Sequence, residues 1–272
     1  MVKKVLKQIL PFHIRYYIRQ LIFPASIDKF VASKKQGYSQ FIKKGNLVFD
    51  VGANMGNRSG IFLSLGARVI AVEPQDACVK YLRLRYGKKI IIIQKGLGAK
   101  EEIKEFFLSP DHTISSFSSE WIDSVTNSGR FAKSSWNKSI KMQVTTLDNL
   151  ISEFGLPDFI KIDVEGFEPE VLRGLSIPVR ALSFEYSTPE QNWQTQDCLQ
   201  ILSKINPEIQ CNYSVGETLK LELSEWLSSE KMMEYVNSDD FQRTGFGDIY
   251  VLMKKETDES KSNKELSGWE GP

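Results

Sequence analysis

Four side chains in this sequence are of types that can take up a proton from a substrate. Asp163 and Glu165 stand one residue apart in FIKIDVEGFEPEVLRG, Glu185 lies in RALSFEY, and His112 lies in LSPDHTISSF. A carboxylate or an imidazole that is held beside a hydroxyl can act as a general base. These four residues are therefore our candidates for catalysis. The three carboxylates also offer the oxygen ligands that Mg²⁺ prefers, but we predict no metal site.

The relative orientation of Asp163 and Glu165 depends on the local backbone. The two side chains face the same way if a strand runs through both residues, and they diverge if the chain turns there. Glu165 and Glu168 also precede a predicted short helix, where negative charge is favourable near the N-terminus. A carboxylate that follows a buried apolar strand needs a partner, which makes Asp163 the stronger candidate for a functional role.

A glycine-rich segment lies upstream of these carboxylates. Residues 46–60 read NLVFDVGANMGNRSG, an apolar run that ends in Asp50 and is followed by Gly52, Gly56 and Gly60. This pattern predicts a strand, a tight turn, and a helix whose N-terminal N–H groups face a ligand. Glu73 follows Gly52 by 21 residues, where a carboxylate can accept hydrogen bonds from ribose hydroxyls. Together the two features predict a cofactor-binding α/β domain.

The spacing of the glycines separates classes of cofactor. A dinucleotide fingerprint reads G-x-G-x-x-G, because its second glycine makes room for a pyrophosphate. Here the spacing is G-x-x-x-G with Asn54 in the middle, which disfavours an NAD-linked oxidoreductase. The D-x-G-x-N-x-G form resembles motif I of class I S-adenosylmethionine (SAM) methyltransferases. The alternative is that the glycines only let a strand and a helix pack closely.

The elements that must position these residues can be read from the alternation of apolar runs and amphipathic stretches. Strands are predicted at 47–51, 68–73, 88–96, 158–166, 180–186 and 248–253, and helices at 57–65, 76–86, 147–154, 169–174, 196–205 and 224–236. Residues 96–145 are too long for a simple crossover and predict an insertion with two strands, IKEFFL and IKMQVTT. Because ligands of open α/β sheets bind at the carboxyl ends of the strands, we expect the candidate residues to meet at that edge.

Composition and charge limit the classes of partner and cellular compartment that the sequence favours. The formal net charge of +1 gives no case for nucleic-acid binding. Three scattered cysteines, Cys78, Cys198 and Cys211, indicate neither a zinc site nor a disulfide framework and fit a reducing compartment such as the cytoplasm. No apolar run is long enough to span a bilayer. Residues 255–272 are rich in Lys, Glu, Ser, Asp and Gly, which predicts a disordered tail.

The N-terminal part of the chain is strongly basic. Residues 1–44 hold ten Lys/Arg and one acidic residue, a net charge of +9, while the remainder carries −8. We predict that residues 1–45 form a basic helical extension to a domain at 46–254. Residues 1–22 have apolar positions at near-helical spacing, so this arm either packs on its own domain or lies on an anionic membrane as a peripheral contact.

The order of the motifs VFDVGANMG, AVEP, TTLDNL and FIKIDVEGFEPEVLRG resembles the FkbM family of SAM-dependent methyltransferases. The resemblance covers Asn46 to Tyr186 and implies a class I methyltransferase fold, a seven-stranded sheet with an antiparallel last strand and helices on both faces. It also implies O-methylation of a hydroxyl on a sugar, a glycan or glycolipid, or a secondary metabolite. The acceptor would then be a small molecule or a glycan. The resemblance does not indicate the oligomeric state.

The resemblance also assigns roles to residues. The residues expected to border SAM are Asp50, Gly52, Ala53, Asn54 and Gly56 at its methionine end, Glu73 and Pro74 at the ribose, Gly96, and Asp163 near the transferred methyl group. Aromatic residues that could stack on a planar or sugar acceptor are Phe117, Trp121, Phe131, Trp136, Tyr186 and Trp193. Two alternatives stay open, an N- or protein methyltransferase and a non-catalytic SAM-binding or scaffold protein. The D/N-PP-Y type signature of amino-group methylation is absent from IDVEGF, which argues against the first alternative.

Overall fold

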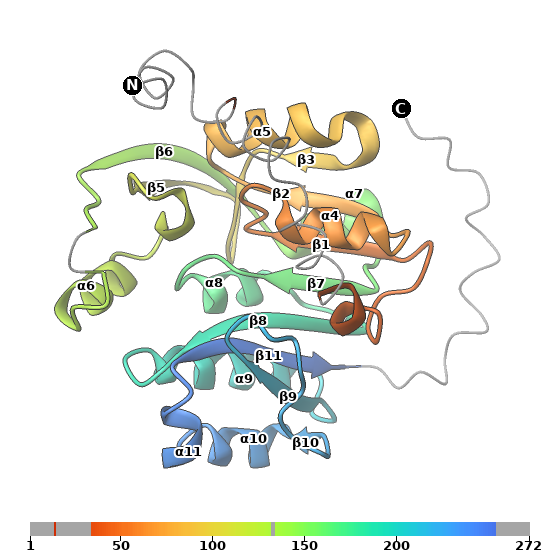
Figure 1. The fold of residues 1–272 in the computed structure, drawn as a ribbon, viewed down its shortest axis with the longest axis vertical. Helices are drawn as coiled ribbons and strands as arrows, with labels where there is room; N and C mark the ends of the chain where they lie inside the picture. The colour runs from red at the N-terminus through yellow and green to blue at the C-terminus, as the bar shows by residue number, and fades with distance from the viewer. Residues whose placement is uncertain (1–13, 15–33, 132–133, 254–272) are drawn as a thin grey trace, which may run out of the picture.

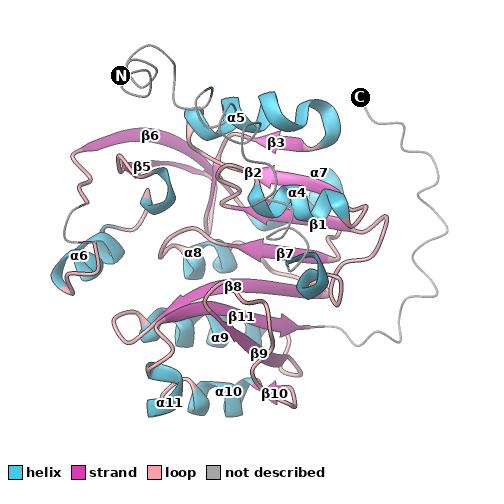
Figure 2. Cartoon of the chain, in the orientation of Figure 1, coloured by secondary structure: helices cyan, strands magenta, loops and turns pink. Residues whose placement is uncertain are grey.

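A large, mostly parallel sheet forms the centre of the protein in a computed structural model that describes residue 14, residues 34–131 and residues 134–253. Strands β3 (Ile91–Ile93), β2 (Arg68–Val72), β1 (Leu47–Val51), β7 (Phe159–Ile162) and β8 (Ala181–Ser187) run parallel in that order. The last strand, β11 (Phe246–Leu252), is antiparallel between β8 and β9 (Gln210–Val215). The carboxyl ends of the parallel strands therefore lie on one edge (Figures 1 and 2).

The prediction of seven strands was wrong by one within the described residues. Strand β10 (Leu227–Ser228) pairs antiparallel with β9 and extends the sheet to eight strands. The same residues correct the predicted helix 224–236, because α10 runs only from Ser229 to Tyr235. The Ser228 hydroxyl accepts a hydrogen bond from the backbone N–H of Lys231 and caps this helix.

Helices cover both faces of the sheet, as the alternating side chains of its strands require. On one face, α4 (Asn57–Ser64) and α5 (Asp76–Tyr86) pack against residues such as Val48 and Val69, and the short 3₁₀ helix η1 (Gly87–Lys89) follows α5. The opposite face, with Phe49 and Val51, packs against the remaining helices of the core. These are α7 (Leu147–Phe154), α8 (Glu168–Arg173), α9 (Asn192–Ile205), α10 and α11 (Asp239–Gln242).

The predicted insertion forms a second, smaller sheet. Strands β4 (Gly96–Leu97), β6 (Lys138–Thr145) and β5 (Glu102–Leu108) pair in that order. The chain between β5 and β6 carries the 3₁₀ helix η2 (His112–Ile114) and helix α6 (Ser119–Asn127). Figure 1 shows β5, β6 and α6 to one side of the main sheet.

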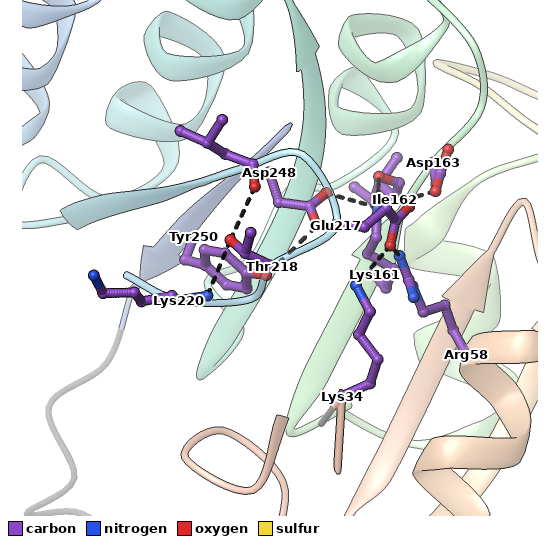
Figure 3. A network of polar contacts seen from close by, with 11 residues as sticks. Lys34, Arg58, Lys161, Ile162, Asp163, Glu217, Thr218, Lys220, Asp248 and Tyr250 are labelled. Atoms are coloured by element: carbon purple, nitrogen blue, oxygen red, sulfur yellow. Dashed lines mark hydrogen bonds and ion pairs between the residues drawn. The ribbon is translucent and has the colours of Figure 1, made fainter. Parts of the chain in front are cut away.

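Residues 34–42, which belong to the predicted basic extension, pack on the main sheet. Residues 34–38 are helical, and Tyr38, Phe41 and Ile42 are buried against the sheet face that α4 covers. The side chain of Glu217, which follows β9, forms ion pairs with Lys34, at 2.9 Å, and with Arg58 of α4 (Figure 3). This part of the predicted extension therefore contacts the domain that is predicted to begin at residue 46.

Other predictions about the ends of the chain lie outside the described residues. These are the membrane or packing role of residues 1–22 and the disordered tail at 255–272. Across residues 34–131 and 134–253, no helix combines the length and apolar character that a membrane span requires.

Candidate active site

The glycine turn after β1 is built by residues in left-handed backbone conformations. Gly52 and Asn54 have φ angles of 79° and 49°, and the N–H groups of Gly52 and Ala53 both donate to the carbonyl of Val72 at 3.0 Å. A Cβ atom on Gly52 would lie 1.8 Å from the carbonyl oxygen of Asp163. Glycine at this position therefore lets the chain after β1 contact the chain after β7 directly.

Two buried carboxylates hold this turn in place. Glu73 accepts hydrogen bonds from the backbone N–H of Asn54, at 2.8 Å, and of Gln75, at 2.7 Å. Burial raises the pKa of Glu73 to about 7, although these hydrogen bonds act to lower it. Asp50 accepts a hydrogen bond from the Ser59 hydroxyl at 2.5 Å, and burial raises the pKa of Asp50 to about 6. Glu73 thus links the end of β2 to the turn, and Asp50 links β1 to α4.

A cleft opens beside this turn, and we call it the glycine-turn cleft. Of the residues predicted to bind cofactor or to catalyse, those that line it are Gly52, Asn54, Glu73, Pro74, Gly96, His112, Asp163 and Glu165. Asp50, Ala53 and Gly56 do not line it. Asp50 is turned toward Ser59 beneath the turn, Ala53 is buried in the core beside α4, and Gly56 is the N-cap of α4.

Three of the candidate catalytic residues converge. Asp163, Glu165 and Glu185 each place a carboxylate oxygen within 4.8 Å of the others, and we call them the carboxylate cluster. The chain does turn after β7, because Glu165 adopts a φ of 54° and Gly166 a φ of 85°. A non-glycine residue in this region carries a strain of about 1–2 kcal/mol. The turn brings Asp163 and Glu165 together rather than apart.

The electrostatics of the cluster set its two glutamates apart from ordinary carboxylates. Burial, followed by the negative charge of Asp163, raises the pKa values of Glu165 and Glu185 well above the usual range. Like charges this close cannot all stay ionised. A carboxylate with a raised pKa binds a proton more readily than an ordinary one, as a general base requires.

A buried lysine supplies positive charge below the cluster. Lys161 of β7 is 1% exposed, and its Nζ lies 3.3 Å from Asp163 Oδ2 and 2.9 Å from Asp248 Oδ1 of β11 (Figure 3). It also donates to the carbonyl of Ile162 at 3.1 Å. Burial opposes the charged form, but the two aspartates outweigh it and raise the pKa of Lys161 well above its ordinary value. Lys161 thus fixes Asp163 and links it to Asp248 of β11.

Residues 109–131 of the insertion cover this site, and we call them the roof segment. The carbonyl of His112 accepts hydrogen bonds from Asn54 Nδ2, at 3.3 Å, and from Gln75 Nε2, at 2.9 Å. The Ser116 hydroxyl donates to the carbonyl of Glu165 at 2.6 Å. His112 therefore meets the glycine turn and is not part of the carboxylate cluster among the described residues. Burial, partly offset by Asp111, lowers the pKa of its side chain.

Comparison with known proteins identifies the family. The profile of the Methyltransferase FkbM domain matches residues 50–215, more than half of the chain. The chain belongs to the FkbM methyltransferase family. The resemblance seen in the sequence motifs is thereby confirmed, and with it the class I methyltransferase fold apart from the added strand β10.

Solved structures similar to this FkbM methyltransferase share little of its sequence. A precorrin-6y C5,15-methyltransferase from Geobacter metallireducens is 10% identical over 82% of this chain and 87% of its own, with a TM-score of 0.39. A TehB-like SAM-dependent methyltransferase from Corynebacterium glutamicum is 11% identical over 85% and 100%, with a TM-score of 0.41. The plantazolicin methyltransferase BpumL, solved with a triazolic desmethylPZN analog and SAH, is 9% identical over 84% and 86%, with a TM-score of 0.42. No curated protein sequence matches the chain.

Several residues that lie beside the carboxylate cluster or line a second cavity were not predicted from the sequence. Lys161 could have been noticed, because a lysine inside the apolar run FIKID must be buried or lie at a special position. Gln191 and Thr195, near the start of α9, carry no such signal. Among the aromatic candidates, Phe117 lines the glycine-turn cleft and Trp121 and Tyr186 line a second cavity. Trp193 is 54% exposed, and Phe131 and Trp136 pack on Trp121.

Proposed function

We propose that this FkbM-family protein is a SAM-dependent O-methyltransferase that acts on a hydroxyl of a sugar, a glycan or glycolipid, or a secondary metabolite. The observation that carries the proposal is the convergence of Asp163, Glu165 and Glu185, of which Asp163 and Glu165 line the same cleft as the glycine turn and Glu73. A carboxylate with a raised pKa suits the removal of a proton from a hydroxyl as that oxygen is alkylated. The N- and protein-methylation alternative has no comparable support.

The residues of the cleft fit SAM. A carboxylate has about four lone-pair sites, and those of Glu73 are only partly used by Asn54 and Gln75. Glu73 can therefore also accept hydrogen bonds from ribose hydroxyls, while Gly52 and Asn54 border the methionine end. SAM, when bound, supplies a methyl group that its sulfonium already activates. The chain must then orient the hydroxyl, exclude water and take up the proton. We assign proton uptake to Glu185, with Glu165 sharing the charge.

Calorimetric titration tests the cofactor. SAM and S-adenosylhomocysteine are expected to bind and NAD is not, because the turn lacks the glycine that makes room for a pyrophosphate. Preferential binding of NAD would contradict the proposal. Release of S-adenosylhomocysteine in the presence of hydroxylated acceptors then tests transfer itself.

Glu73→Ala is expected to weaken SAM binding by about 1–3 kcal/mol, the range for leaving buried partners unpaired. The variant removes the ribose acceptor and also frees the N–H of Asn54 in the turn. Calorimetry on folded protein measures the change. Glu153→Ala, on the exposed side of α7, is the control and should bind SAM like the unmodified protein. An unchanged affinity in Glu73→Ala would place Glu73 outside the site.

The pH dependence of turnover should report the carboxylate cluster. Because the base must be unprotonated, kcat/KM is expected to rise with pH through an apparent pKa well above the ordinary glutamate value of 4.5. That value belongs to the coupled cluster rather than to one residue. Glu185→Gln should lower turnover at least about 100-fold, the lower range for losing a general base. A profile that stays flat down to pH 5 in the unmodified enzyme would contradict this assignment.

Removal of divalent metal ions is expected to leave activity intact. Lys161 already places positive charge 3.3 Å from Asp163, so the carboxylate cluster has a cation of its own. Turnover after treatment with EDTA and dialysis should equal that of untreated enzyme. Loss of activity that Mg²⁺ or Mn²⁺ restores would instead make the carboxylate cluster a metal site.

A further inference from the structure

A second cavity lies on the other side of the carboxylate cluster, and we call it the Gln191 cavity. The residues that line it are Trp121, Gly166, Glu168, Glu185, Tyr186, Ser187, Gln191, Gln194 and Thr195. Its volume is about 10 Å³, which is room for one water molecule or for one hydroxyl group. The walls are almost entirely polar. A cavity of this size and polarity accepts a single small hydrogen-bonding group.

Two polar side chains in its wall have no partner within the described part of the chain. Gln191 is 4% exposed and Thr195 is 2% exposed, and neither Gln191 Nε2 nor Thr195 Oγ1 has a hydrogen bond among these residues. Their neighbour Gln194 differs, because its Nε2 donates to the carbonyl of Gly166 at 3.0 Å. Each buried polar group left unpaired costs about 1–3 kcal/mol. The two free groups therefore point to a polar group that enters the cavity from outside the chain.

The cavity and the glycine-turn cleft meet at the carboxylate cluster. Glu185 lines the Gln191 cavity, whereas Asp163 and Glu165 line the cleft, and their carboxylate oxygens lie within 4.8 Å of one another. A hydroxyl that reaches Glu185 from the cleft side thus lies close to any group held by Gln191 and Thr195. Adjacent substituents of one molecule can span that separation.

We propose that Gln191 and Thr195 bind a second hydroxyl of the acceptor, next to the hydroxyl that is methylated, so that the acceptor is a neutral polyhydroxylated ring of the sugar type. This inference rests on the proposed function and narrows it. A hydroxyl both accepts, as Gln191 Nε2 requires, and donates, as Glu185 requires. The surrounding Asp163, Glu165, Glu168 and Glu185 disfavour phosphate or carboxylate groups at this point.

An acceptor with a single hydroxyl lacks the group that this cavity binds. It would leave Gln191 and Thr195 unpaired, whereas a site built to hydrogen-bond a substrate hydroxyl rejects analogues that lack it. The first experiment therefore compares methyl glycosides of glucose, galactose, mannose, rhamnose and fucose with cyclohexanol and phenol. Release of S-adenosylhomocysteine above the acceptor-free background is measured with SAM as donor.

Turnover of at least one glycoside, with none of cyclohexanol or phenol, is the expected result. SAM binding in the calorimeter without turnover of any glycoside would overturn this inference and leave the proposed function standing. Turnover of cyclohexanol or phenol at a comparable rate would also overturn it. Failure to bind SAM would instead overturn the proposed function itself.

The second experiment tests whether Thr195 and Gln191 bind the second hydroxyl of the acceptor. With the best glycoside, removal of one hydroxyl adjacent to the methylated position should lower kcat/KM of the unmodified enzyme at least tenfold. Thr195→Val and Gln191→Leu should each lower kcat/KM for the complete glycoside to a similar extent. In these variants kcat/KM for the deoxy analogue should be only slightly lower than for the complete glycoside, because the contact to that hydroxyl is already absent. Equal penalties for the deoxy analogue in variant and unmodified enzyme would overturn the assignment.

Thermal stability separates substrate recognition from a structural role. Thr195→Val and Gln191→Leu remove unpaired buried groups, so their thermal midpoints should stay equal or rise. Ser183→Ala is the matched control, because Ser183 is a fully buried hydroxyl of β8 without a partner among the described residues and lies outside both cavities. It should keep full turnover. Lower midpoints with unchanged turnover in the Thr195 and Gln191 variants would show that these groups hold a resident water molecule, which would overturn the proposal.

Discussion

Lys161→Met is expected to destabilise the fold by about 3–5 kcal/mol, the range for removing one partner of a buried ion pair. The side chain that it replaces is 1% exposed and lies between Asp163 and Asp248. Methionine fills a similar volume but leaves both carboxylates without their cation. Because the pKa of Lys161 is raised, its stabilisation is fully present below the unfolded value of about 10.4 and is lost only as pH rises above it.

The same substitution should weaken SAM binding, because Asp163 lines the glycine-turn cleft and Lys161 fixes its carboxylate. Urea unfolding at neutral pH measures the stability, and calorimetry measures the affinity. Lys161→Arg keeps the positive charge, so it should lose much less stability and much less affinity for SAM. Adding Asp248→Asn to Lys161→Met should recover part of the stability, because it removes one buried charge left unpaired. A loss below about 1 kcal/mol in Lys161→Met would show that water or local relaxation replaces the lysine.

Gly52→Ala is expected to disrupt the cleft and the strands beside it. The new Cβ atom would lie 1.8 Å from the carbonyl oxygen of Asp163, and neither group is a flexible side chain. Gly52 also has a φ of 79°, which an alanine adopts at a cost of about 1–2 kcal/mol. We expect a further 1–3 kcal/mol or so for the overpacking, together with loss of SAM binding as Asp163 is displaced.

Gly45→Ala is the control that isolates the backbone cost. Gly45 has a similar φ of 89°, but a Cβ atom there would meet nothing within 4 Å. Urea unfolding of both variants gives the difference, and calorimetry with SAM should find normal binding only for Gly45→Ala. Equal losses of stability in the two variants would mean that the contact between Gly52 and Asp163 relaxes without cost.

Local signals in the sequence predicted the parts of the site that depend on neighbouring residues. The run LVFDV followed by spaced glycines indicated β1, its turn and α4, and the carboxylates at strand ends were correctly expected at one edge of the sheet. Glu185 joined Asp163 and Glu165 because parallel strands β7 and β8 are neighbours. The prediction of an insertion at 96–145 was likewise based on a length that no simple crossover needs.

Features that depend on distant packing were missed. Tyr38 and Phe41 read as part of a basic extension, yet Phe41 stacks on Phe159 of β7 and Tyr250 of β11, and Tyr38 meets Phe159 edge-on. Gln191 and Thr195 are polar residues near a helix start, a pattern typical of a solvated surface. They are nevertheless buried, in a cavity that Trp121 of the roof segment, Glu168 of α8 and residues of β8 also line. Strand β10 is two residues long and has no periodicity of its own.

The roof segment connects β5 to β6, whose sheet is separate from the one that carries the carboxylate cluster. Substitutions, insertions or deletions between residues 109 and 131 therefore leave the pairing of β1, β7 and β8 untouched. Natural variation or directed evolution can therefore alter this segment while the strands that carry the carboxylate cluster keep their pairing, although the hydrogen bond from Ser116 to the carbonyl of Glu165 would have to be kept. We expect homologues with new acceptors to diverge first in this stretch, which makes it the place to randomise when changing specificity.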